Sequence, residues 1–257
     1  MIKMNNLDLD KILVTSFCTN ERTSQFNEHC IKKLNFPNSL MINNEKGFKE
    51  KYVDFAKKGL DTSCEYFIRI DGDHFIFDGI FDLLSVAINE EYDWLTGVVH
   101  DYAMNNYRGG TPQILTRKVL ELLANDNDLM PNHQKPESEY SNNIRHLTKM
   151  GDVRILTALH EYEQYPSKIC NSFLNRLHRN HLGLYNAEHL NSLPDSYKKA
   201  ISYAFDVYGK NANKVSMDFE DFSFLDKTFE PIFAESIDDL YNHYQDVYNR
   251  VKSTFVR

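Results

Sequence analysis

Apolar and polar positions follow two different periods along the N-terminal part of the chain. Short runs rich in β-branched and aromatic side chains predict strands at 11–17, 39–42, 66–70 and 94–99. Between these runs, apolar residues recur every three or four positions, which predicts helices at 24–34, 48–59 and 78–88. Strands and helices that alternate through connections of ordinary length are typical of a parallel sheet with helices on its faces.

The apolar run from Tyr66 to Ile70 leads directly into Asp71-Gly72-Asp73. Ligands of an open α/β sheet bind at the carboxyl ends of its strands, and Gly72 allows the sharp turn that brings both carboxylates to one cation. Mg²⁺ and Mn²⁺ prefer such oxygen ligands and keep open positions for phosphate. Asp8-Leu9-Asp10 has the same spacing without an apolar strand before it. The position after a strand therefore favours a metal site over the alternative of a turn or helix cap.

Polar loops also follow the first two predicted strands, at Thr19–Ser24 and Asn43–Asn44. Right-handed crossovers place them at the same edge as Asp71–Asp73, which predicts a nucleotide pocket there; the alternative is that these loops are solvated connections. The chain has no Gly-x-Gly-x-x-Gly after its first strand and no Walker Gly-Lys-Ser/Thr sequence. A metal ion must then balance the phosphate charge.

The middle of the chain continues the same alternation with longer connections. Gly and Pro residues predict that 108–112 is the most flexible turn, and a helix follows at about 116–124. A second helix is predicted from Glu137 toward Met150. A strand is predicted at 153–156, with His160 shortly beyond it.

The C-terminal part is predicted to be mainly helical. Basic residues between Lys168 and His181 predict a helix whose basic face is either solvated or meets an anionic ligand. The last helix begins at a capping box formed by Ser236 and Asp239, and tyrosines recur along it at helical spacing. This stripe is expected to dock on its own domain, with a homodimer contact as the other possibility.

Composition narrows the classes of function. The net charge of −8 argues against binding nucleic acid by general phosphate attraction, and 42% hydrophobic with 26% charged residues is typical of a globular chain. The first residues are not those of a signal peptide, and no apolar run approaches the ~18 residues of a membrane span. A cytoplasmic protein is expected. Widely spaced cysteines predict buried thiols in a reducing compartment, at Cys18, Cys30, Cys64 and Cys170.

The order of several short motifs resembles a known family. The first strand with Thr19–Arg22, then Ile70–Asp73, then Glu139–Ile155 and finally His160 resemble the GT-A fold glycosyltransferases, above all their family 2 group. The resemblance spans Lys11–Pro166 and implies an α/β fold with a Rossmann-type, mostly parallel sheet flanked by helices. It further implies a nucleotide-sugar-binding and catalytic core at 1–168 and a mainly helical extension at 169–257 packed on that core.

The resemblance also implies an activity and its residues. A metal-dependent enzyme would transfer a sugar from a nucleoside diphosphate sugar to an acceptor hydroxyl of a glycan or lipopolysaccharide, using Mn²⁺ or Mg²⁺. The implied metal ligands are Asp71, Asp73 and His160. The implied contacts to the nucleotide sugar are Thr19, Asn20, Glu21, Arg22, Asn43, Asn44, Asp71 and Lys168. Gly109 and Gly110 are expected on the acceptor side.

The general base is the point at which the chain departs from the family. The family usually has a Glu-Asp pair, whereas Tyr140 follows Glu139 here. Glu139 is therefore the first candidate for the base, Glu137 the second and Asp101 a further one. Asn43 and Asn44 stand where the family usually has an Asp that contacts the nucleoside.

Three other functions remain open at this point. The first is a phage-type glycosyltransferase that acts on a modified DNA base, which the negative charge disfavours. The second is a nucleotidyltransferase, which usually carries a glycine in its first loop that Thr19–Ser24 lacks. The third is a non-catalytic nucleotide-sugar-binding protein.

Overall fold

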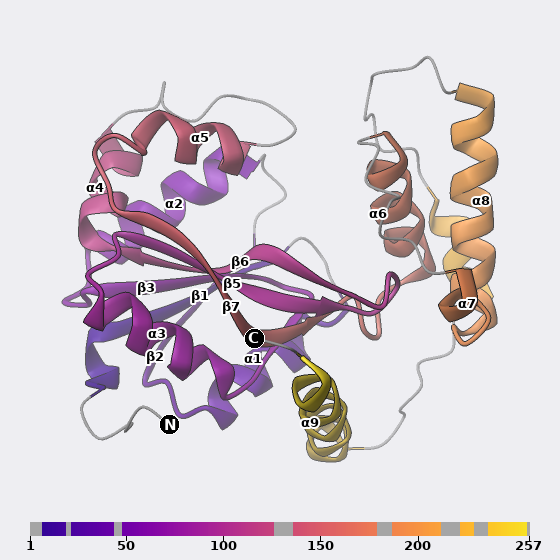
Figure 1. Cartoon of the computed structure of the whole chain (residues 1–257), viewed down its shortest axis with the longest axis horizontal. Coiled ribbons are helices and arrows are strands. Elements are labelled where there is room, and N and C mark those ends of the chain that lie inside the picture. The colour runs from indigo at the N-terminus through magenta and orange to yellow at the C-terminus, as the bar shows by residue number, and fades with distance from the viewer. Residues whose placement is uncertain are drawn as a thin grey trace.

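A single seven-stranded sheet forms the centre of the molecule (Figure 1). The computed structural model describes residues 7–18, 22–43, 48–125, 136–178, 187–211, 222–228 and 236–255. The strand order is β2-β1-β3-β6-β5-β7-β4. The strands are β1 (Ile12–Cys18), β2 (Asn38–Asn43), β3 (Tyr66–Asp71), β4 (His74–Ile76), β5 (Trp94–Asp101), β6 (Asn106–Thr116) and β7 (Met150–His160).

The direction of the strands confirms the predicted α/β fold class with a mostly parallel, GT-A-like sheet. β1 pairs in parallel with both β2 and β3, and β5 pairs in parallel with β7. β6 is antiparallel to β3 and β5, and β4 is antiparallel to β7. Five strands therefore run in one direction, and their carboxyl ends meet at one edge of the sheet.

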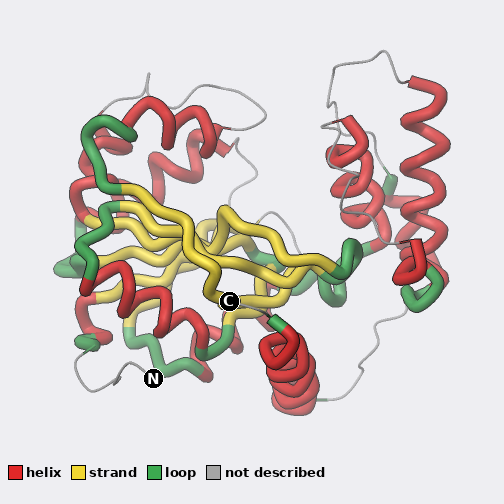
Figure 2. Tube along the Cα trace, viewed as in Figure 1, coloured by secondary structure: helices red, strands yellow, loops and turns green. Residues whose placement is uncertain are grey.

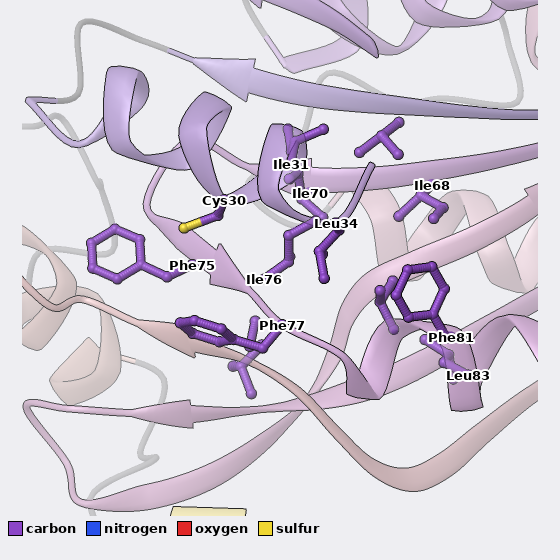
Figure 3. Packing of buried hydrophobic residues seen from close by; sticks show 14 of the residues in the cluster. Cys30, Ile31, Leu34, Ile68, Ile70, Phe75, Ile76, Phe77, Phe81 and Leu83 are labelled. Carbon is purple, nitrogen blue, oxygen red and sulfur yellow. The ribbon is translucent and has the colours of Figure 1, made fainter. Parts of the chain in front are cut away.

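Helices cover both faces of this sheet and bury two separate apolar cores. One face is covered by α1 (Ser24–Lys33), α3 (Gly79–Asn89) and α9 (Ile237–Thr254). Figure 3 shows side chains of α1 and α3 meeting those of β3 and β4 in this core. The other face is covered by α2 (Phe48–Leu60), α4 (Arg117–Asn125) and α5 (Pro136–Ile144).

A third apolar core lies beyond the end of the sheet, where Figure 2 shows a group of helices set apart from the strands. It is built by α6 (Pro166–His178), α8 (Asp195–Asn211) and the 3₁₀ helix η4 (Ser223–Thr228), with the short α7 (Ala187–Leu190) beside them. Ala103 and Met104, from the β5–β6 connection, pack into the same core. The chain then returns to the sheet through α9, so the C-terminal residues contribute to two different cores.

Long-range pairing overturns several predictions for the middle of the chain. The expected flexible turn at 108–112 is wrong, because these residues lie within β6 and pair with β5. Only Gly110 keeps the positive φ of a turn residue, at 100°. The helix expected to reach Met150 ends at Ile144, and the strand expected at 153–156 is longer, since pairing with β5 extends it.

The last helix confirms its predicted start. The Ser236 hydroxyl accepts a hydrogen bond from the Asp239 backbone N–H at 3.2 Å, as a capping residue does. Tyr244 and Tyr248 are buried against the sheet, and the Tyr248 hydroxyl donates to the Leu156 carbonyl at 2.8 Å. The tyrosine stripe therefore docks on its own domain, which was the first of its two interpretations.

All four cysteines are buried free thiols, as predicted. Burial raises the pKa of the Cys30 thiol. A hydrogen bond with the Cys30 backbone lowers this pKa but does not offset the effect of burial. None of the helices in the described parts of the chain has the length and apolar character needed to cross a membrane.

One carboxylate joins three elements at the start of β5. Asp93 accepts hydrogen bonds from Lys118 Nζ at 2.9 Å, from the Lys149 backbone N–H at 2.9 Å and from Thr116 Oγ1 at 3.2 Å. Burial acts to raise the pKa of the Asp93 carboxyl, but the bonds from Lys118 and Lys149 outweigh it and lower that pKa.

We expect Asp93→Asn to lower the free energy of unfolding by about 0.5 kcal/mol at neutral pH, because solvent screens this charge and the amide oxygen still accepts one bond. A lowered folded-state pKa means that the carboxylate stabilises the fold above the unfolded-state pKa of about 3.9. This contribution is lost as the pH falls through the folded-state value. Urea unfolding of both proteins should therefore show a difference that shrinks from about pH 7 to about pH 3. A constant difference over that range would contradict the assignment.

Candidate functional site

The turn from β3 into β4 lies at the carboxyl edge of the sheet. The Gly72 backbone N–H donates to the Phe17 carbonyl at the end of β1, at 2.8 Å. The Thr23 hydroxyl, just before α1, donates to the Gly72 carbonyl at 3.1 Å. These bonds hold Asp71 and Asp73 directly beyond a buried strand, where the sequence predicted them.

A buried arginine orients the first of the two acids. Arg69 is only 1% exposed, and its Nη2 lies 2.5 Å from Asp71 Oδ1. The guanidinium lies over the rings of Phe17 and Tyr52, 4.8 and 5.4 Å from their centroids. Because a buried cation requires a partner, Arg69 holds the Asp71 carboxylate in place at the edge of the pocket described below.

His160, the last residue of β7, lies between two carboxylates. Its Nε2 is 3.4 Å from Asp73 Oδ2, and its Nδ1 is 3.3 Å from Asp101 Oδ2. Arg108 Nη2 lies 3.1 Å from the same Nε2. Burial and Arg108 act to lower the pKa of His160, but Asp73, Glu161 and Asp101 outweigh them and raise it to about 9. Three chain segments far apart in sequence therefore meet at this imidazole.

The neighbouring His74 is a different kind of histidine. Its Nδ1 accepts a hydrogen bond from the Asp71 backbone N–H at 3.1 Å. Burial is the main cause that lowers the pKa of His74, to about 4, so the ring is neutral at physiological pH. A neutral ring that accepts at Nδ1 carries its proton on Nε2. In this tautomer Nε2 cannot bind a metal, and His74 serves to hold the Asp71–Asp73 turn.

Arg176 forms buried ion pairs with two carboxylates next to His160. Arg176 Nη2 lies 2.5 Å from Asp101 Oδ2 and 3.0 Å from Glu161 Oε1. Burial acts to raise the pKa of Asp101, but Arg176 and His160 hold it well below its usual range. Although Asp101, His160 and Glu161 come close enough to share a metal ion, Arg176 already supplies the cation for both carboxylates. The interpretation of Arg176 as part of a solvated basic face is wrong, since its partners bury it.

An open pocket of about 360 Å³ lies against these residues. Its acidic and basic lining residues are Asp71, Asp73, Glu161, His160, Lys51, Arg108 and Lys168. Lys51 comes from α2 and is only 6% exposed, with its Nζ 3.1 Å from the Cys18 carbonyl. The pocket therefore combines three carboxylates and a histidine with three basic side chains, a composition that suits a site for a metal ion and phosphates.

The structure brings together four residues that the sequence predicted separately: Asp71, Asp73, His160 and Lys168. Asp101 lies in the same cluster, directly behind His160. Arg22 reaches the loop after β7, where its Nη2 is 3.4 Å from Glu163 Oε2.

Other predicted residues lie elsewhere. Gly109 and Gly110 do not line this pocket; they line a separate cavity of about 600 Å³ beside β5 and β7. Asn43 ends β2, and only its backbone is described. Glu137 and Glu139 belong to α5, whose first side chains are also outside the description. Thr19, Asn20, Glu21 and Asn44 lie outside the described residues.

Sequence reasoning found Lys168 but missed the other three cations of the site, Arg69, Lys51 and Arg108. Arg69 could have been found, because a charged residue in the middle of the apolar run Tyr66–Ile70 requires a buried partner. Lys51 and Arg108 carry no such signal, since lysine and arginine at helix and strand positions are usually solvated. Their role follows only from the way α2 and β6 pack beside β1 and β5.

The carboxyl edge offers ligand atoms for a divalent ion. Ligand atoms of Asp73, His74 and His160 lie within 4.8 Å of one another, and Asp71, which is outside this group, lines the same pocket. The carboxylates of Asp71 and Asp73 are the oxygen ligands that Mn²⁺ and Mg²⁺ prefer, and such sites leave positions for phosphate oxygens. Because the pKa of His160 is raised to about 9, an ion that binds its ring must displace a proton.

Comparisons of the sequence with known proteins do not assign the chain to a family. No protein-family model matches the chain, and no curated protein matches it. Among solved structures, the chain is similar to a glycosyltransferase involved in glycosylation of the major capsid of PBCV-1, with 11% identity, 58% of this chain and 92% of that chain covered, and a TM-score of 0.40. It is also similar to 4-diphosphocytidyl-2C-methyl-D-erythritol synthase from Anaerococcus prevotii, with 10% identity, 60% and 91% covered, and a TM-score of 0.41.

A third similar structure is TarS from S. aureus, with 12% identity, 79% of this chain and 73% of that chain covered, and a TM-score of 0.43. All of these TM-scores lie below 0.5. The function proposed below therefore rests on the residues of the pocket.

Proposed function

We propose that this protein is a metal-dependent glycosyltransferase that moves a sugar from a nucleoside diphosphate sugar to a hydroxyl of a saccharide acceptor. The observation that carries the proposal is the convergence of Asp71, Asp73 and His160 with three basic side chains in one pocket at the carboxyl edge of the sheet. Such a pocket matches a diphosphate bound through a divalent ion.

We assign Asp71, Asp73 and His160 as the residues that would hold the ion. A bound Mn²⁺ or Mg²⁺ would supply Lewis acidity to the leaving diphosphate. Arg69 orients the Asp71 carboxylate, with its Nη2 2.5 Å from Asp71 Oδ1. Asp101 lies behind His160 and orients its ring.

Three basic side chains would bind the diphosphate as its negative charge grows. Lys51, Arg108 and Lys168 come from α2, β6 and α6, so the pocket draws its positive charge from three directions. Preorganised cations in a partly buried site stabilise developing charge more than mobile ions in water do. The predicted loop Thr19–Arg22 and the segment Asn43–Asn44 would contact the nucleoside.

The acceptor proton requires a carboxylate that is free to take it. Asp101 is 2% exposed and engaged by Arg176 and His160, and its lowered pKa makes it a weak base. Glu139 and then Glu137 remain the proposed bases of an inverting reaction. Gly109 and Gly110 stay proposed for the acceptor side, in the cavity that they line next to β5 and β7.

Thermal shift experiments test the proposal. We expect UDP- or GDP-sugars to stabilise the protein in the presence of Mn²⁺ and to do so much less after chelation, because the ion links the diphosphate to Asp71 and Asp73. A ligand at about 100 times its Kd adds about 2.7 kcal/mol to the stability, which is readily measured. Absence of metal-linked stabilisation by every nucleotide sugar would overturn the proposal.

Product analysis separates this function from its alternatives. Release of a nucleoside diphosphate from the sugar nucleotide supports glycosyl transfer. Formation of a sugar nucleotide and pyrophosphate from a nucleoside triphosphate and a sugar phosphate would identify a nucleotidyltransferase instead. Metal-linked binding with neither reaction would identify a nucleotide-sugar-binding protein.

A further inference from the structure

Part of the pocket wall is formed by residues that are not assigned above to the metal ion or to the diphosphate. It is formed by the loop after β7 and by the polar side of α6, through Glu161, Gln164, Asn171, Ser172 and Asn175. The opposite side of α6 packs into the third core. The helix therefore turns a stripe of neutral hydrogen-bonding groups toward the pocket.

Within the described part of the chain, two buried acceptor atoms on residues of this wall have no hydrogen-bond partner. Glu161 is 2% exposed and Gln164 is 1% exposed. Glu161 Oε2 and Gln164 Oε1 are each buried and have no hydrogen-bond partner among the described residues. Because a buried unsatisfied oxygen is costly, two of them on neighbouring residues of one pocket wall indicate a ligand that donates hydrogen bonds.

The surrounding structure holds the Glu161 side chain and the Gln164 backbone in place. The other carboxylate oxygen of Glu161 accepts from Arg176 Nη2 at 3.0 Å and from the Ser172 hydroxyl. The backbone carbonyl of Gln164 accepts from the Tyr197 hydroxyl at 2.9 Å. Glu161 and Glu163 have φ values of 62° and 57°, in the left-handed region that costs energy for residues other than glycine. A strained backbone of this kind persists where the surroundings over-determine it, as they do at binding sites.

The chemistry of the two oxygens selects the ligand group. A carboxylate oxygen and an amide oxygen both accept, so their partners must be O–H or N–H donors. The negative charge of Glu161 disfavours a phosphate or a carboxylate of the ligand at this position. Since Lys51, Arg108 and Lys168 face the diphosphate of the proposed donor, the remaining neutral, hydroxyl-rich part of that donor is its sugar.

We propose that Glu161 and Gln164 form a subsite that recognises two hydroxyls of the donor's sugar, so that the donor carries a neutral sugar with free hydroxyl groups. The inference rests on the proposed function, because the diphosphate must already occupy the cationic part of the pocket. The two residues then act as specificity determinants of the transfer.

Calorimetric titration in the presence of Mn²⁺ tests the subsite. UDP, GDP, ADP, CDP and dTDP are titrated first. Each nucleoside diphosphate that binds is then compared with its conjugate to a neutral hexose. The last ligands are conjugates in which one hydroxyl of that hexose has been removed, the monodeoxy analogues. We expect the hexose conjugate to bind the wild-type protein about tenfold more tightly than the nucleoside diphosphate does. Gln164→Leu should weaken the conjugate by roughly three- to tenfold and leave the nucleoside diphosphate unchanged.

The deoxy analogues distinguish direct recognition of the sugar from a purely structural role of Gln164. A structural role would not make the difference in affinity between variant and wild type depend on which hydroxyl is absent. One monodeoxy analogue should bind Gln164→Leu and wild type equally, because the hydroxyl that Gln164 contacts is already absent. Glu161→Gln should show the same equality for a different hydroxyl. Gln245→Leu on α9, whose amide contacts only Tyr241 and Asn249 in the described structure, is the matched control and should change nothing.

Two results would overturn the inference in different ways. The subsite would be disproved if Gln164→Leu weakened the binding of the nucleoside diphosphate and of the hexose conjugate equally. It would also be disproved if the hexose added no affinity in the wild-type protein. Neither result would contradict the proposed function. Failure of every nucleotide to bind with Mn²⁺ would remove the proposed function and the subsite together.

Discussion

Replacing both Asp71 and Asp73 with asparagine is expected to reduce sugar transfer by roughly 10²- to 10³-fold or more while the protein stays folded. The variant keeps the size of both side chains but loses the two charges at the carboxyl edge of the sheet. A divalent ion would then lack its carboxylates, and the leaving diphosphate would lose the charge that stabilises it. Initial rates of nucleoside diphosphate release measure the loss, and far-ultraviolet circular dichroism reports the fold.

The chain offers a matched control for this experiment. Asp8 and Asp10 have the same spacing, but they are exposed and lie at a short 3₁₀ turn before β1. Their double asparagine variant should retain full activity and full Mn²⁺-linked stabilisation by the nucleotide sugar. Unchanged turnover in Asp71→Asn/Asp73→Asn would contradict the proposed metal site.

The second large effect is expected on stability. Arg176→Met should lower the free energy of unfolding by about 3 to 5 kcal/mol, because it leaves two buried carboxylates without their cation. Asp101 and Glu161 have side chains only 2% and 3% exposed, so water cannot replace the guanidinium. Urea unfolding followed by tryptophan fluorescence measures the change, with Trp94 buried at the start of β5.

Two further variants make this prediction specific. Arg250→Met changes an exposed arginine on α9 in the same way, and its effect should stay within about 0.5 kcal/mol. Adding Asp101→Asn and Glu161→Gln to Arg176→Met removes the uncompensated charges and should recover more than half of the loss. A loss below about 1 kcal/mol in the single variant would show that Arg176 is not the charge partner of both carboxylates.

Local sequence patterns predicted most of the elements that carry the site. The run Tyr66–Ile70 ends in Asp71 and Asp73 in the structure as it does in the sequence, because a buried strand and a glycine turn are both encoded by neighbouring residues. The same holds for α9, whose start is set by Ser236 and Asp239 only three positions apart. His160 at a strand end was likewise predicted from its position after an apolar run.

Residues 106–116 show where local patterns fail. Two glycines and a proline are typical of a turn, yet this segment forms β6 because β3 and β5 supply hydrogen-bond partners on both of its sides. Pairing of this kind joins residues far apart in the chain. As a result, the cation Arg108 lies beside His160, where the sequence placed only a flexible connection.

The sequence by itself determined the alternating strands and helices, the position of the two acids after the third predicted strand, and the polar, acidic character of that edge. Only the tertiary structure decided which charges meet there: Arg69 with Asp71, His160 between Asp73 and Asp101, and Arg176 behind them. The physical reason is that periodicity and turn chemistry depend on neighbours in the chain. The pairing of a buried charge depends on residues that approach only when distant strands and helices pack together.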